Sequence, residues 1–187
     1  MRAIVMLFAV LAVFCTSRPA AAIEARGAAY AGQQFREIKA LSDEEIAALH
    51  NGEGMGFAKA AELNGYPGPR HVLDLANELD LSSAQKRQLT ALYERMNAEA
   101  RALGAALIER ERALEALFAG GTITPQSLAA ETTRIADIRG RLRAVHLAAH
   151  LEAKATLGPD QVARYNHLRG YDEPAAVGHD HPADHRH

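Results

Sequence analysis

The most regular pattern of hydrophobic positions lies in residues 82–119, where apolar side chains recur every three or four residues. This spacing predicts an amphipathic helix with one buried face. The helix should begin at the capping box Ser82-Ser83-Ala84-Gln85 and, since no proline follows before Pro125, should continue for about 37 residues. Its apolar stripe consists of Leu89, Leu92, Met96, Ala100, Leu103, Leu107, Leu114 and Leu117.

A second long helix is expected from Thr124 to about Thr156, with Thr124 as N-cap and Pro125 as the first helical residue. The connector across Gly120-Gly121 is so short that the two helices must lie antiparallel, each burying its stripe against the other. The apolar positions of the second helix are Leu128, Ile135, Ile138, Leu142, Val145 and Ala149. The sequence therefore predicts an all-α fold built on a long antiparallel helical hairpin, about 50 Å in length.

Short helices are expected to flank this hairpin. The capping box Ser42-Asp43-Glu44-Glu45 begins one, residues 57–63 permit a further turn or two, Pro69 can begin another, and a last one starts at Leu157. We divide the chain into a signal peptide (residues 1–22), an N-terminal segment with short helices (23–70), the hairpin domain (71–170) and a His-rich tail (171–187). The tail has little to bury and is expected to be disordered without metal.

The hairpin stripe raises the question of oligomeric state. Two helices that share one thin stripe leave apolar surface uncovered, and a second copy of the chain would cover it, so we expect a homodimer. In the alternative arrangement, the short helices of residues 23–70 fold back over the hairpin and complete a monomer.

The first 22 residues have the features of a cleaved secretory signal peptide. Residues 3–15 form an uncharged apolar run that is too short to span a bilayer, and Ala20-Ala21-Ala22 suits signal peptidase. A lipoprotein acylated at Cys15 is the alternative, but the bulky Phe14 stands where a small residue would be expected. After cleavage we expect a soluble periplasmic chain that does not span the membrane and has no cysteine.

Composition limits the classes of protein that remain. The 187 residues are 48% hydrophobic and 24% charged, with a formal net charge of −2 and a single cysteine. One cysteine excludes a disulfide scaffold, and the apolar fraction excludes a wholly disordered chain. A secreted chain of net negative charge without interleaved aromatic residues is not typical of nucleic-acid-binding proteins, so no nucleic-acid partner is expected.

A five-residue pattern recurs at the start of two predicted helices, as Leu81-Ser82-Ser83-Ala84-Gln85 and Leu157-Gly158-Pro159-Asp160-Gln161. Behind a signal peptide, and on both sides of a helical hairpin, it resembles the Leu-Thr-x-x-Gln motif of the Spy/CpxP/ZraP group of periplasmic stress proteins. The resemblance covers residues 71–170. In the second copy Gly158 replaces the hydroxyl residue, which removes the side-chain half of the helix cap.

The resemblance implies a non-enzymatic protein. Members of this group are curved helical dimers that hold partly unfolded envelope proteins, bind metals or modulate a membrane stress sensor. The sequence is consistent with a non-enzymatic protein, since it contains none of three common enzyme motifs: Gly-x-Ser-x-Gly, a phosphate-binding loop or His-Glu-x-x-His. Two functions remain open: a metal-binding sensor or scavenger, which the histidines favour, and an ATP-independent chaperone for unfolded envelope proteins, which the open hairpin favours.

Histidines are the candidate metal ligands. His146 and His150 are four residues apart, so both imidazoles lie on one face of the second long helix and could share an ion. The tail adds His179, His181, His185 and His187. Imidazole and carboxylate ligands suit Zn²⁺, Cu²⁺ or Ni²⁺, and no organic cofactor is expected. The alternatives are a merely solubilising tail and a pair of polar residues beside the apolar stripe.

Two further sets of side chains are candidates for binding. Arg139, Arg141 and Arg143 make the second helix basic and could attract unfolded clients. The alternative is solvated ion pairing across the hairpin with Glu94, Glu99, Glu109 and Glu111. Met55 and Met96 could add thioether ligands for Cu(I), although filling the core is the simpler role.

Overall fold

The computed structural model describes residues 28–172 of the chain. The chain divides between Gln34 and Phe35, and the short described stretch before this boundary consists of turns that lead into η1 (Gln33–Phe35). All the helices discussed below belong to the part from Phe35 onward. The predicted signal peptide, residues 1–22, and the four tail histidines lie outside the described residues.

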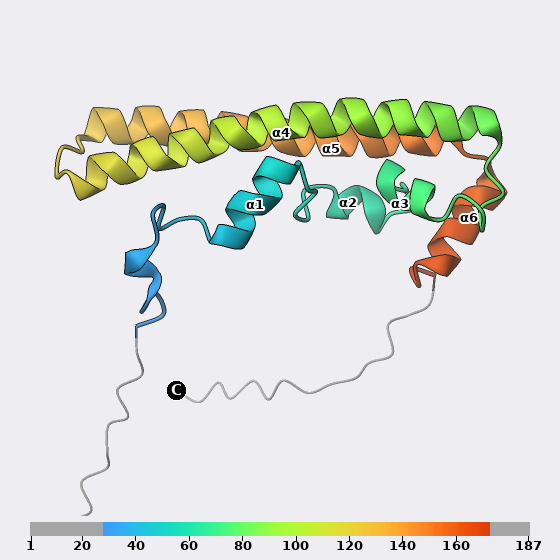
Figure 1. The fold of residues 1–187 in the computed structure, drawn as a ribbon, viewed down its shortest axis with the longest axis horizontal. Coiled ribbons are helices and arrows are strands. Elements are labelled where there is room, and N and C mark those ends of the chain that lie inside the picture. The colour runs from blue at the N-terminus through green and yellow to red at the C-terminus, as the bar shows by residue number, and fades with distance from the viewer. Residues whose placement is uncertain (1–27, 173–187) are drawn as a thin grey trace, which may run out of the picture. The chain divides into compact units, whose positions relative to one another are not determined.

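Two long antiparallel helices lie side by side, as the sequence predicts (Figure 1). Helix α4 (Ser83–Ala119) has 37 residues and α5 (Pro125–Thr156) has 32. The connector turns at Gly121, whose φ of 64° is the left-handed conformation that glycine adopts without strain. No strand occurs in residues 28–172, and none of their helices is long and apolar enough to cross a bilayer. The predicted all-α hairpin is confirmed.

The shorter helices are α1 (Asp43–Asn51), α2 (Lys59–Glu62), α3 (Pro69–Asp74) and α6 (Pro159–Leu168). Helix α1 has the predicted capping box between Ser42 and Glu45. Helix α2 is shorter than the predicted span of 57–63, because the preceding chain is a run of turns in which Gly56 has a positive φ of 79°. Pro69 begins α3 as expected, but the helix ends after six residues and turns connect it to α4.

The hydrophobic core consists of two clusters along the hairpin, and both include side chains from before the hairpin. One cluster contains Ile38, Leu41, Leu49, Ala100, Leu103, Leu107, Ile108, Ile135 and Leu142. The other contains Val72, Leu79, Leu81, Leu89, Leu92, Ala149, Ala153, Leu157 and Tyr165. The segment before α4 thus covers one face of the hairpin, which is the arrangement expected in the alternative to a dimer. The homodimer itself stays a prediction.

Helix α1 lies against α4 at Gly104, where the two backbones approach closely. A Cβ atom built on Gly104 would lie 2.3 Å from the carbonyl oxygen of Leu49, so only glycine fits at this position. Residues Gly104 and Leu49 are both buried. This glycine therefore sets how closely the N-terminal segment can pack on the hairpin.

Side chains of α4 bind the end of α1. The amide Nδ2 of Asn97 donates to the carbonyl of Asn51 at 2.7 Å, and Nε of Arg101 donates to the carbonyl of His50 at 3.1 Å. The last carbonyls of a helix have no partner within the helix. Helix α4 supplies those partners, so the end of α1 is fixed to the hairpin by hydrogen bonds to its main chain.

The two five-residue motifs serve as helix starts that pack together. In each, the glutamine side chain accepts a hydrogen bond from the N-cap residue, at 3.0 Å from Ser82 to Gln85 and at 2.9 Å from Gly158 to Gln161. The glutamine half of the cap therefore survives at Gly158, although glycine has no side chain to complete it. The motif leucines, Leu81 and Leu157, are buried in the same core cluster.

Candidate metal centre

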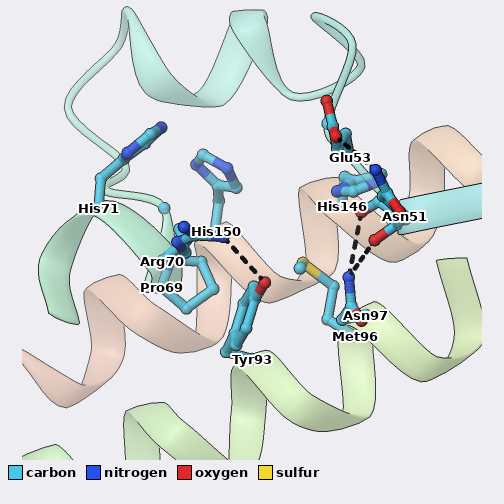
Figure 2. A pocket seen from close by; sticks show the side chains of 13 residues that line it. Asn51, Glu53, Pro69, Arg70, His71, Tyr93, Met96, Asn97, His146 and His150 are labelled. Atoms are coloured by element: carbon cyan, nitrogen blue, oxygen red, sulfur yellow. Dashed lines mark hydrogen bonds between the residues drawn. The ribbon is translucent and has the colours of Figure 1, made fainter. Parts of the chain in front are cut away.

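A cavity of about 380 Å³ lies between the N-terminal segment and the middle of the hairpin. Figure 2 shows that His146 and His150 project into it from α5, while His71 comes from α3 and Met96 comes from α4. The loop after α1 contributes Glu53. The structure thus brings the predicted histidine pair into one cavity, together with a third histidine that the sequence did not single out as a ligand.

His146 is buried, with 3% of its surface exposed. Its ring stacks on Phe57, with ring centroids 5.9 Å apart and planes inclined by 17°. Its Nε2 atom is buried and has no hydrogen-bond partner among residues 28–172. Burial lowers the pKa of His146, and the charge of nearby His150 lowers it further. The ring is therefore uncharged at neutral pH, which is the form that binds a metal ion.

His150 is held in a defined orientation by the main chain before α3. Its Nδ1 lies 2.7 Å from the carbonyl oxygen of Tyr66. A carbonyl can only accept, so Nδ1 carries a proton and donates it to this oxygen. A Cβ atom on Gly68 would lie 3.0 Å from Nε2, so glycine leaves the space that the ring edge occupies. Histidines that bind a metal through one nitrogen usually donate the other ring N–H to a carbonyl or carboxylate, and the contact with Tyr66 is of this kind.

Glu62 connects His150 to the C-terminal part of the described chain. Its Oε2 lies 3.5 Å from Nδ1 of His150 and accepts a hydrogen bond from the N–H of Gly68 at 3.1 Å. Its Oε1 accepts from the hydroxyls of Tyr165 at 2.5 Å and Tyr171 at 3.1 Å. Burial, followed by the hydrogen bond to Glu62, raises the pKa of Tyr165. One carboxylate thus joins α2, α5 and α6.

The cavity contains two of the predicted metal ligands. His146 and His150 supply two imidazoles, whereas a tetrahedral ion takes four ligands. Within residues 28–172, no three or more histidine, cysteine, aspartate or glutamate side chains are grouped so that they could hold an ion. The described residues therefore bring two imidazoles to one cavity, and metal binding there stays a prediction.

The three arginines proposed for client binding differ in their surroundings. Arg139 donates to Glu111, a buried residue of α4, at 2.8 Å, which is the ion pair across the hairpin that the alternative interpretation expects. Arg141 and Arg143 are exposed. Because side chains two residues apart on a helix do not face each other, Arg141 points away from the side that Arg139 and Arg143 share. Client binding by these residues stays a prediction.

Met55 and Met96, the two candidate thioether ligands, lie in different surroundings. Met55 is exposed and has a positive φ of 43° in the loop before α2. Met96 packs against the second core cluster and also lines the cavity. Filling the core therefore accounts for Met96, as the simpler interpretation expects, although the residue also lines the cavity that contains the histidines.

Sequence reasoning did not single out Glu62, Tyr66, Tyr165 or Tyr171. It identified residues 64–69 only as a break between helices, and the structure shows that this break delivers the Tyr66 carbonyl to His150. The sequence did carry one signal for the tyrosines, which is that aromatic residues are scarce: the chain has five tyrosines and 5% aromatic residues. Two of these tyrosines, near the end of the last predicted helix, bind the same carboxylate.

Comparison with known proteins agrees with the resemblance drawn from the two motifs. A family model described as LTXXQ motif family protein matches residues 69–169, more than half of the chain. No curated protein and no solved structure matches the chain in these comparisons. The matched family includes Spy/CpxP/ZraP-like proteins, and its members are periplasmic. The matched residues span the hairpin, both motifs and both α5 histidines, and the chain belongs to the LTXXQ motif family.

Proposed function

We propose that this protein is a non-enzymatic periplasmic stress protein that binds divalent transition-metal ions through His146 and His150, as a sensor or a scavenger. The observation that carries the proposal is the buried Nε2 of His146, which has no hydrogen-bond partner among the described residues, on a side chain that lines one cavity together with His150. A buried polar nitrogen without a partner destabilises the fold unless something binds it. A metal ion would bind it.

The chemistry of the two rings supports an ion rather than a hydrogen-bonded organic ligand. Both histidines lie on one face of α5, and His150 presents Nε2 because Tyr66 holds its other nitrogen. Imidazole nitrogen suits Zn²⁺, Cu²⁺ and Ni²⁺. The carboxylate of Glu53 and the thioether of Met96 line the same cavity.

Metal titration of the chain from residue 23 onward tests the proposal. We expect Zn²⁺ to bind in competition with a chromophoric chelator, and His146→Gln and His150→Gln each to weaken the tightest binding by tenfold or more. His50→Gln is the matched control, because His50 is exposed on α1 and its side chain lies outside the cavity lining. Circular dichroism checks that each variant is folded. Absence of binding at micromolar concentrations, or unchanged affinity in the double variant, would contradict the proposal.

A second candidate function, ATP-independent chaperone activity, is favoured by a different observation. At the loop end of the hairpin, Phe118 of α4 is 55% exposed and Leu128 of α5 is 40% exposed. Exposed apolar side chains suit transient binding of unfolded chains. We expect the protein to delay the aggregation of a reduced model client, and Phe118→Ser/Leu128→Ser to shorten the delay. Turbidity that develops at the same rate with equimolar protein would exclude this function.

A further inference from the structure

Glu62, the last residue of α2, places a carboxylate beside one of the two proposed metal ligands. Only 13% of its side chain is exposed, and its Oε2 lies 3.5 Å from Nδ1 of His150. This is the ring nitrogen that donates to the carbonyl of Tyr66 at 2.7 Å. Two acceptors therefore lie at the Nδ1 side of the ring, a neutral carbonyl and a carboxylate, and Nε2 is the nitrogen that remains for a metal ion.

Glu62 also holds the turn that carries the Tyr66 carbonyl. Its Oε2 accepts a hydrogen bond at 3.1 Å from the main-chain N–H of Gly68, which follows Glu62 by six residues. Tyr66 lies within the loop that this hydrogen bond closes, and Nζ of Lys154 on α5 lies 3.8 Å from the centroid of its ring. Glu62 thus acts on His150 in two ways, directly through its carboxylate and indirectly through the turn.

The other oxygen of Glu62 is held from the side of α6. Oε1 accepts from the hydroxyls of Tyr165 at 2.5 Å and Tyr171 at 3.1 Å, and it lies 3.7 Å from Nε of Arg169. Tyr165 is fully buried, so the position of its hydroxyl is set by the core around it. With both oxygens engaged, the orientation of the carboxylate toward His150 is already fixed before an ion binds.

The chemistry of a metal-bound histidine explains why such a partner matters. A partner at the second ring nitrogen fixes the orientation of the imidazole and makes the nitrogen that binds the metal more basic. A divalent ion at Nε2 would bring positive charge into a largely buried place. A carboxylate stabilises that charge by direct attraction, which a neutral carbonyl provides only weakly.

We propose that Glu62 is the positioning residue of this metal site. Through the turn at Gly68 and its own carboxylate beside Nδ1, it holds the His150 ring in the orientation that binds the ion and offsets the charge that the ion brings. The inference rests on the proposed metal binding. Glu62 acts through His150 and is not itself a ligand, so removing it should lower the affinity and leave the number of bound ions unchanged.

Metal titration of Glu62→Gln in the chain from residue 23 tests this role. Glutamine keeps the shape of the side chain and removes its charge, and we expect Zn²⁺ affinity to fall by about 10–100-fold. Glu111→Gln is the matched control, because Glu111 is also a buried carboxylate but pairs with Arg139 across the hairpin at 2.8 Å. Its affinity should stay within about twofold of the unmodified chain. Unchanged affinity in Glu62→Gln, or an equal loss in Glu111→Gln, would overturn the inference.

The ring nitrogens of His150 provide a readout that needs no metal and that a merely structural role would not move. In ¹H–¹⁵N NMR spectra at neutral pH, the signals of His150 are those lost in His150→Gln. We expect its two ¹⁵N shifts to be far apart in the unmodified chain, because Tyr66 fixes one tautomer, and to move toward each other in Glu62→Gln. The shifts of His146 should stay unchanged. Unaltered His150 shifts in Glu62→Gln would contradict the positioning role.

Glu62→Asp provides a conservative variant that keeps the charge but draws the carboxylate back from His150. We expect its Zn²⁺ affinity to lie between those of the unmodified chain and Glu62→Gln. Circular dichroism shows whether each variant is folded. If Glu62→Gln does not fold, the test passes to Glu62→Asp, in which unchanged affinity would overturn the inference.

The unmodified chain separates failure of the inference from failure of the proposed function. Zn²⁺ binding that needs His146 and His150 but tolerates Glu62→Gln overturns the positioning role alone. Absence of Zn²⁺ binding by the unmodified chain at micromolar concentrations overturns both.

Discussion

The side-chain amides of Gln85 and Gln161 bind each other where α4 and α6 begin. Nε2 of Gln85 donates to Oε1 of Gln161 at 2.8 Å, and Nε2 of Gln161 donates back to Oε1 of Gln85 at 3.3 Å. The same nitrogens also donate to the carbonyls of Thr156 and Leu79, each at 3.0 Å. The last residue of each motif thus caps its own helix and also joins the two ends of the hairpin domain.

Replacing these glutamines should therefore reveal coupling between them. We expect Gln85→Ala and Gln161→Ala each to lower the free energy of unfolding by about 1–2 kcal/mol, because each leaves partly buried partners without a hydrogen bond. The double variant should lose less than the sum of the two by roughly 0.5–1 kcal/mol. Urea unfolding of the four proteins measures both quantities. Strict additivity would mean that the two amides act independently.

Gln88 provides the matched control for this cycle. It lies one turn after Gln85 on α4 and is exposed. Gln88→Ala should change the free energy of unfolding by less than about 0.5 kcal/mol, as is usual for an exposed helical position. An equal loss at Gln88 would show that the effect at Gln85 comes from helix propensity and not from the motif.

Replacing a helical glycine by alanine should lower the stability of the protein at Gly104 and raise it at Gly140. Gly104→Ala should destabilise the protein by about 1–3 kcal/mol, since the new methyl group would collide with the Leu49 carbonyl and force α1 away from α4. Gly140→Ala should stabilise it by about 0.5–1 kcal/mol, because the space around Gly140 is open and alanine favours helix. Thermal unfolding of both variants tests this prediction. Equal effects of one sign would argue against the close approach at Gly104.

Alkaline pH should destabilise the fold through Tyr165. The pKa of this buried phenol is raised in the folded state, so its contribution to stability is fully present below the unfolded value of about 10. As the pH rises above that value, the unfolded chain loses a proton that the folded chain keeps, and stability falls by about 1.4 kcal/mol per pH unit.

The measurement is denaturant unfolding between pH 8 and pH 11 for the unmodified protein and Tyr165→Phe. The variant should be less stable by about 1–2 kcal/mol at pH 8, because it loses the hydrogen bond to Glu62. Its stability should then fall less steeply above pH 10. Parallel curves for the two proteins would show that Tyr165 does not cause the alkaline loss.

The homodimer predicted from the sequence can be tested on the outer side of α5. Leu151 is 58% exposed there, and burying it against a second copy would stabilise an association. We expect light scattering to give the mass of a dimer, and Leu151→Arg to shift the mass toward the monomer. A monomer mass for the unmodified chain at tens of micromolar would contradict the dimer.

The long helices could be predicted because the signals that define them are local. The spacing of Leu89, Leu92 and Leu103 and the caps at Ser82 and Thr124 lie within the helices themselves, and the structure has both helices within a residue of the predicted bounds. Local patterns could not decide whether the short helices before α4 or a second copy of the chain would cover the apolar face of the hairpin. It depends on contacts such as that between Asn97 and Asn51, 46 residues apart, which no local pattern encodes.

In the candidate site, too, the features set by local spacing could be predicted, and those set by contacts between distant segments could not. The spacing of His146 and His150 on one helix face predicted that both rings would point the same way, and they line one cavity. Their surroundings come from other elements, because the carbonyl of Tyr66 and the carboxylate of Glu62 reach His150 only after α2 and the following turn pack on α5. The role of the tail histidines stays a prediction, because those residues lie outside the described part of the chain.

The way in which α1 is attached to the hairpin bears on which substitutions the protein can tolerate. Helix α4 holds the end of α1 by its carbonyl groups, and every residue type carries that group. Positions 50 and 51 should therefore accept many residues, whereas Asn97 and Gly104, which make the attachment, should accept few. A library that randomises each of these four positions and selects for folded protein would show this asymmetry directly, with sequence freedom on α1 and restriction on α4.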